Sequence, residues 1–171
     1  LSFRLNKGMI TVGQDQHIMG YGRYGNIVLS DKAPAYPFYA VNYQPSSWLK
    51  FNYMHAWFQS GVLDTRATYD LNNQVYGGVR QQYLPKFFAT HSVEIAPMKG
   101  LKLNLGESIV YSENLQLAYM LPVTFFKAFD NQKYGDNILA GSNGQFFFGF
   151  SSRNQLPNTH LYGQWMIDEI R

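Results

Sequence analysis

Two short stretches of the sequence, LKFNY (residues 49–53) and LKLNL (residues 101–105), decide the fold class. In both, an apolar residue occupies every second position, and Lys or Asn fills the positions between. Successive side chains of a β-strand point to opposite faces of the sheet, so this period of two predicts strands with one apolar and one polar face. Tyr39, Val41 and Tyr43 repeat the pattern, and we therefore expect an all-β protein.

The apolar positions of these strands are rich in aromatic residues. Phe, Tyr and Trp make up 17% of the chain, whereas charged residues make up only 15%. An aromatic-rich apolar face opposite a polar one is typical of a strand in the wall of an outer-membrane β-barrel. Alternation identifies the apolar face but does not say what covers it, so a water-soluble β-sandwich or barrel packed through the same residues remains the alternative.

Strand length favours the membrane interpretation. Segments 47–58 and 86–96 each continue the strand pattern for about 11 or 12 residues. At roughly 3.3 Å per residue and a tilt near 45°, such strands cross a hydrocarbon layer of about 25–30 Å. Strands of soluble proteins are nearer about 5–6 residues.

Turn chemistry predicts antiparallel hairpins. Gly8 and Gly100 supply the backbone freedom that tight turns need, and Pro45 marks a third short connection. Longer polar stretches separate other strands, at residues 15–24, 60–82 and 130–143. Short turns on one side of a sheet and long loops on the other suit a barrel.

We expect one segment of an antiparallel transmembrane β-barrel spanning residues 1–171 and supplying about 8–10 strands of a larger barrel. Because both ends of the chain fall in strand-like sequence, it is expected to belong to a longer protein. Pro122 and apolar residues three and four apart predict at most one short helix, near 121–129. The expected strands lie near residues 2–6, 9–14, 25–30, 36–44, 47–59, 84–96, 101–111, 144–152 and 159–168.

The composition argues against several functional classes. The 14 basic and 11 acidic residues are scattered, without the basic run that tracks a nucleic-acid backbone, and the chain has no cysteine for disulfides or thiolate metal sites. Gly20–Gly25 has the glycine spacing of a nucleotide loop, but a strand pattern follows it where a helix is required. The four histidines are too far apart to pair on one element. We expect no nucleic-acid partner, cofactor, metal or enzymatic activity.

Several short segments follow one another in a recognisable order and approximate spacing. They are Ile10–Asp15 leading into Gly20–Gly25, Lys86–Ile95, Leu105–Ser108, Tyr119–Pro122, Asp136-Asn137 and Tyr162–Glu169. Together they resemble a known family, the Wzi-type capsule-assembly outer-membrane barrels and their relatives in Bacteroidetes. The resemblance implies a large antiparallel barrel in the outer membrane of a Gram-negative bacterium, with a non-enzymatic role in binding or assembling surface polysaccharide. It implies membrane lipid as a partner, together with surface polysaccharide or other outer-membrane subunits.

The residues expected to contact polysaccharide lie in the long loops or in these matching segments. Aromatic rings stack on sugar faces, and arginine binds carboxylates through two parallel hydrogen bonds, which suits acidic sugars. The candidates are Arg23, Tyr24, Arg80, Glu107, Asp136 and Asn137.

Two further functions remain open from the sequence. The first is a pore, or a subunit of an outer-membrane transport or secretion complex, in which polar residues of the strands line the lumen. The second is a soluble β-domain that binds glycans or cleaves glycosidic bonds. The candidates for lining a lumen are Lys50, Asn52, Glu94, Lys102 and Asn104.

Overall fold

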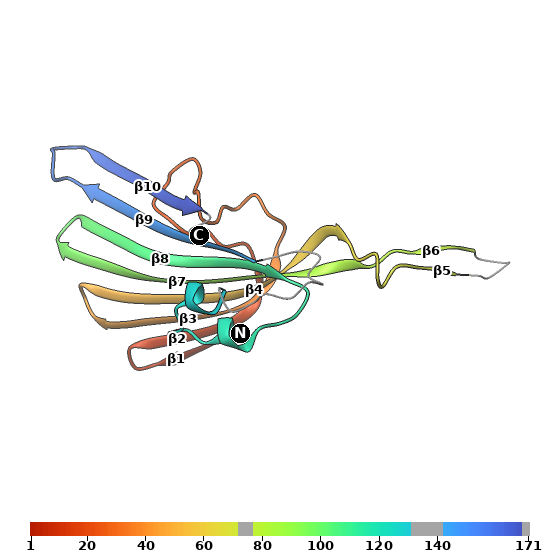
Figure 1. The fold of residues 1–171 in the computed structure, drawn as a ribbon. Coiled ribbons are helices and arrows are strands. Elements are labelled where there is room, and N and C mark those ends of the chain that lie inside the picture. Colours follow the sequence, from red (N-terminus) through yellow and green to blue (C-terminus); the bar gives the residue numbers. More distant parts are fainter. Residues whose placement is uncertain (72–76, 131–141, 169–171) are drawn as a thin grey trace.

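The computed structural model describes residues 1–71, 77–130 and 142–168, and antiparallel strands dominate it (Figure 1). Eight strands form one sheet in the order β1-β2-β3-β4-β7-β8-β9-β10. The prediction of an all-β protein is confirmed. The strands of this sheet are β1 (Ser2–Leu5), β2 (Gly8–Asp15), β3 (Tyr36–Ser46), β4 (Leu49–Leu63), β7 (Tyr83–Met98), β8 (Leu101–Ser112), β9 (Asn143–Arg153) and β10 (His160–Asp168).

Within the described residues the sheet is open. Strand β1 pairs only with β2 and strand β10 only with β9, so these two strands are its edges. The short turns β1–β2, β3–β4, β7–β8 and β9–β10 all lie at one end, on the left of Figure 1. The long connections leave from the other end. There, β5 (Tyr69–Leu71) and β6 (Gly78–Arg80) form a separate hairpin that projects beyond the sheet.

Two predicted elements differ from the structure. Residues 25–30 are not a strand of the sheet, because β2 pairs directly with β3 and leaves no place between them. Leu29 forms only an isolated bridge with Met19. The predicted helix is shorter and later than expected, since α1 spans Phe126–Asp130 and is preceded by the 3-10 turn η1 (Leu117–Met120). No helix in the described residues is both long and apolar enough to cross a membrane.

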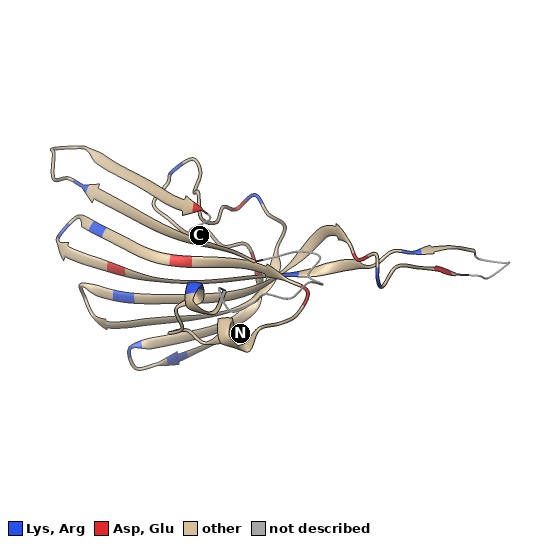
Figure 2. Ribbon diagram, in the orientation of Figure 1, with Lys and Arg blue, Asp and Glu red and all other residues tan. Residues whose placement is uncertain are grey.

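Strand register places the alternating residues in continuous rows. One row crosses six strands on what we call the apolar face, and it consists of Tyr43, Phe51, Val93, Leu105, Phe148 and Trp165. The neighbouring row points to the opposite side, the polar face, and consists of Lys50, Glu94, Asn104, Gly149 and Gln164. Charged residues are sparse on the strands (Figure 2).

The apolar face divides into a covered half and an exposed half. Toward the long-loop end, η1 and α1 bury a core in which Tyr119 and Phe126 pack on Tyr53 and Ile109. Toward the short turns the face is open. Leu105 and Trp165 are each 56% exposed there.

The polar face also changes character along the strands. Toward the short turns it carries the charged and amide residues of the polar row. Toward the long-loop end it is apolar, because Phe38, Met54 and Phe88 form a second core with Met19 and Leu29. Residues 16–35, which we call the 16–35 loop, thus fold back over this face. The alternation of apolar and polar residues predicted the two faces of the sheet, but it did not predict that the 16–35 loop covers one of them.

Candidate functional site

The five residues predicted to line a lumen all point to the polar face. Lys50, Glu94 and Asn104 lie opposite one another in one row across the sheet. Asn52, two residues after Lys50 in β4, lies opposite Ser92 of β7. Lys102 Nζ lies 3.0 Å from Glu94 Oε1 and forms an ion pair with it. A polar surface at the short-turn end therefore exists as the alternation predicts, whereas its contact with a water-filled lumen stays a prediction.

The 16–35 loop is fixed to this surface by side-chain hydrogen bonds. The Tyr21 hydroxyl donates to Glu94 Oε2 at 2.6 Å, and the backbone N–H of Ile27 donates to Gln164 Oε1 at 3.2 Å. Burial, and the nearby Glu94 carboxylate, raise the pKa of the Tyr21 hydroxyl above its usual value. The hydroxyl therefore stays protonated and remains a donor at neutral pH.

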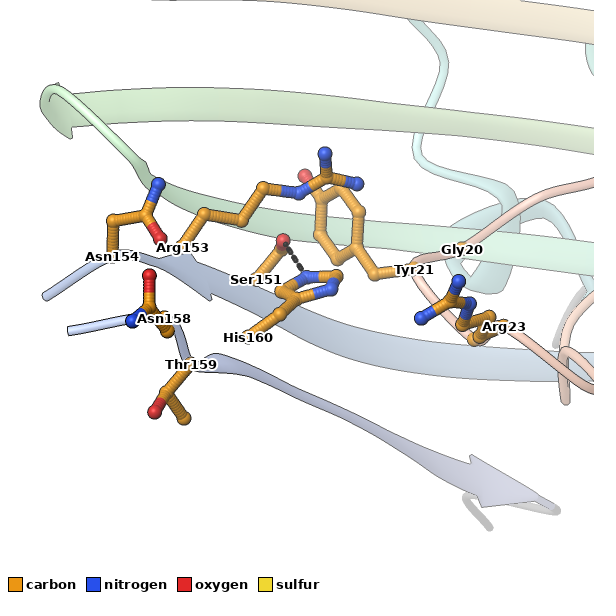
Figure 3. A pocket seen from close by; sticks show the side chains of 10 residues that line it. Gly20, Tyr21, Arg23, Ser151, Arg153, Asn154, Asn158, Thr159 and His160 are labelled. Atoms are coloured by element: carbon orange, nitrogen blue, oxygen red, sulfur yellow. Dashed lines mark hydrogen bonds between the residues drawn. The ribbon is translucent and has the colours of Figure 1, made fainter. Parts of the chain in front are cut away.

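A polar pocket of about 760 Å³ lies between this loop and the β9–β10 turn (Figure 3). Figure 3 shows the Arg153 side chain reaching toward Tyr21, with Arg23 beyond it. His160 Nε2 and the Ser151 hydroxyl are 2.9 Å apart on the floor. The lining residues are Gly20, Tyr21, Gly22, Arg23, Ser151, Arg153, Asn154, Asn158, Thr159 and His160.

The pocket is cationic. Two arginines line it, and the lining contains no Asp or Glu. Within the described part of the chain, neither Arg23 nor Arg153 forms a salt bridge. The pocket offers two guanidinium groups and several neutral hydrogen-bond donors. Such groups bind anionic and hydroxyl-rich ligands.

The predicted polysaccharide contacts do not form one site. Arg23 lines the pocket, and Tyr24 beside it is 91% exposed. Arg80 lies on the projecting β5–β6 hairpin, where its Nη1 is 3.4 Å from the Tyr69 hydroxyl. Asp136 and Asn137 lie outside the described residues.

Glu107 is buried on the apolar face, away from the lining of the polar pocket. Its side chain is 4% exposed on the covered half of the apolar face, with Oε1 3.1 Å from His91 Nε2. The same oxygen accepts the backbone N–H of Phe126 at 2.7 Å. Glu107 therefore joins α1 to the sheet, which gives it a structural role, and its expected role as a polysaccharide contact stays a prediction.

Sequence reasoning missed the β9–β10 side of the pocket. Arg153, Asn154 and Asn158 come from the end of β9 and the turn that follows it. Both asparagines have left-handed backbone angles, with φ of 59° and 54°. Residues 153–158 lie between two expected strands, but only the fold brings them next to a loop about 130 residues earlier in the chain.

Comparison with protein-family models, curated proteins and solved structures finds no match to this chain. In the described ranges, His, Asp and Glu residues do not gather in groups of three or more that suit a metal ion. The site must therefore be interpreted from its own residues.

Replacing Tyr21 with Phe is expected to loosen the 16–35 loop. The substitution removes a hydrogen bond to a carboxylate, and such bonds contribute about 1.5–3 kcal/mol. Trypsin cleavage after Arg23 should accelerate by about tenfold, measured as the rate of appearance of the new fragment. Tyr24→Phe is the matched control, because the Tyr24 side chain is 91% exposed to solvent and does not anchor the loop, so its cleavage rate should not change. Equal rates for the two variants would contradict the proposed anchoring.

Proposed function

We propose that this chain forms part of the wall of a bacterial outer-membrane β-barrel that binds or assembles surface polysaccharide without catalysing a reaction. The observation that carries the proposal is the pair of neighbouring rows across the sheet. The apolar row exposes Leu105 and Trp165, while the polar row beside it carries Lys50 and Glu94. This contrast is the one that a lipid-facing and lumen-facing wall requires.

The arrangement of connections supports the same proposal. Hairpins with short turns at one end and long connections at the other are the architecture of outer-membrane barrels (Figure 1). The open edges β1 and β10 each leave backbone groups for a further strand, which a larger barrel would supply. The order of short segments that resembles the Wzi-type barrels favours polysaccharide as the ligand, and the cationic pocket provides suitable chemistry.

The test is fractionation of cells that make the protein, followed by glycan retention. We expect the protein in the outer-membrane fraction, resistant to a high-salt wash and dependent on detergent for extraction. Purified in detergent, it should retain surface polysaccharide from the same cells on an affinity column. Protein that stays in solution without detergent would contradict the membrane assignment, and a column that retains no polysaccharide would contradict the ligand.

A second candidate function is supported by the covered half of the apolar face. There Tyr53, Ile109 and Tyr119 form a packed core, as in a water-soluble domain. A soluble glycan-binding β-domain would use the same pocket. It differs from the first proposal in requiring no detergent, so the fractionation experiment separates the two.

The polar row also supports a pore or transport subunit as a third candidate. If Lys50, Asn52 and Asn104 line a passage, the protein should conduct ions in a planar bilayer, and Lys50→Glu should change its ion selectivity. A bilayer that contains the protein but conducts no ions would favour polysaccharide binding instead.

A further inference from the structure

We propose that the pocket between the 16–35 loop and the β9–β10 turn binds an acidic sugar residue, with Arg23 and Arg153 holding its carboxylate. This inference rests on the proposed polysaccharide-binding function and specifies the chemistry of the ligand. Arg153 comes from the end of β9 and Arg23 from a loop that precedes β3. The binding site thus exists only when the loop is folded over the polar face.

The charges around the pocket favour an anion. Glu94 lies outside the lining but contacts one lining residue, since its carboxylate accepts the hydrogen bond from the Tyr21 hydroxyl. Lys102 Nζ is paired with the same carboxylate at 3.0 Å. The charge of Glu94 is thereby compensated locally, so the two arginines determine the electrostatic character of the pocket. A carboxylate matches the planar fork of a guanidinium group.

The Tyr21 ring provides a fixed surface for a sugar ring. Its hydroxyl is held by Glu94, and the ring packs over Gly149 of β9, where a Cβ atom would lie 3.4 Å from Tyr21 Cδ2. The Tyr21 ring therefore lies directly over the sheet at Gly149. An aromatic ring held in this way costs little ordering entropy when a ligand packs against it.

The remaining lining residues suit sugar hydroxyls. Asn154, Asn158 and Thr159 place amide and hydroxyl groups along one side of the pocket (Figure 3). These groups donate and accept hydrogen bonds, as a polyhydroxylated ring requires. A volume of about 760 Å³ falls in the range of roughly 300–1,000 Å³ that small-ligand sites occupy. An acidic monosaccharide unit within a chain is therefore the ligand that the residues fit.

Titration calorimetry of the detergent-solubilised protein tests this inference. The probe is a galacturonic acid oligomer, compared with the same oligomer after methyl esterification, which removes the charge and keeps the hydroxyls. We expect the acidic oligomer to bind more tightly, and Arg23→Gln and Arg153→Gln each to weaken its binding by roughly tenfold or more. Arg4→Gln is the matched control, because Arg4 lies on β1, at the opposite edge of the sheet from β9 and β10, and it should leave binding unchanged.

The outcomes separate this inference from the proposed function. Equal binding of the esterified oligomer, unaffected by either arginine substitution, would overturn the inference and leave polysaccharide binding intact. Inorganic phosphate that binds as tightly as the acidic oligomer would reduce the pocket to a simple anion site and would also overturn it. If the protein retains no surface polysaccharide and no oligomer, both proposals fail.

Discussion

Glu107→Ala is expected to lower the free energy of unfolding by about 1–3 kcal/mol, the usual cost of leaving a buried hydrogen-bonding group without its partner. The reason is the double role of the carboxylate. Its Oε1 atom lies 3.1 Å from His91 Nε2 and accepts the N–H of Phe126 at 2.7 Å. The substitution leaves His91 without this partner and releases the first residue of α1. Urea unfolding followed by tryptophan fluorescence measures the loss.

Glu107→Gln is the informative companion. An amide oxygen can still accept the Phe126 N–H, but the negative charge beside His91 is gone. We therefore expect its destabilisation to be smaller than that of Glu107→Ala. If Glu107→Ala unfolds at the wild-type urea concentration, Glu107 does not hold α1 on the sheet.

Leu105→Arg is expected to prevent stable insertion into the outer membrane. Leu105 lies on the exposed half of the apolar face, in the row that includes Phe148 and Trp165. A lipid-facing arginine in a barrel costs about 2–4 kcal/mol near the middle of the bilayer. The amount of protein in the outer-membrane fraction, compared with wild type, measures the effect.

Asn104→Arg is the matched control for this substitution. Asn104 is the adjacent residue of β8, but it belongs to the polar row and points to the opposite face. We expect Asn104→Arg to insert normally. Normal amounts of Leu105→Arg in the membrane would show that this face does not contact lipid, since an exposed leucine on a soluble domain tolerates arginine well.

Local patterns predicted the strands well where the period of two coincides with explicit turn residues. Residues 101–111 were expected as a strand, and β8 spans Leu101–Ser112. Gly100, with φ of 84°, forms the predicted turn between β7 and β8. The shared face of Lys50, Glu94 and Asn104 was also predictable. Each is a polar residue between two apolar residues of an alternating strand, and antiparallel pairing keeps the polar positions of neighbouring strands on one side of the sheet.

Contacts between distant segments were not predictable in the same way. Ile27 and Leu29 have strand-like spacing, yet their segment is a loop over the sheet, in which Leu29 packs on the core that contains Phe38 and Phe88 and Ile27 is exposed. The pocket needs Arg153 beside a loop far from it in sequence, and no local pattern specifies that proximity. The structural role of Glu107 was partly predictable, since it occupies an apolar position of its strand, and a buried carboxylate requires a hydrogen-bonding partner.

The proposed outer-membrane wall requires the exposed half of the apolar face to contact lipid. Because η1 and α1 cover the rest of this face, lipid can contact it only at exposed residues such as Trp165. A variant with Trp48→Phe and Trp57→Phe keeps Trp165 as the single tryptophan.

Quenching of Trp165 fluorescence by brominated lipids tests this contact directly. In vesicles whose acyl chains carry bromine, the proposed wall predicts strong quenching by the lipid and little by aqueous acrylamide. Strong acrylamide quenching without any effect of the brominated chains would contradict it.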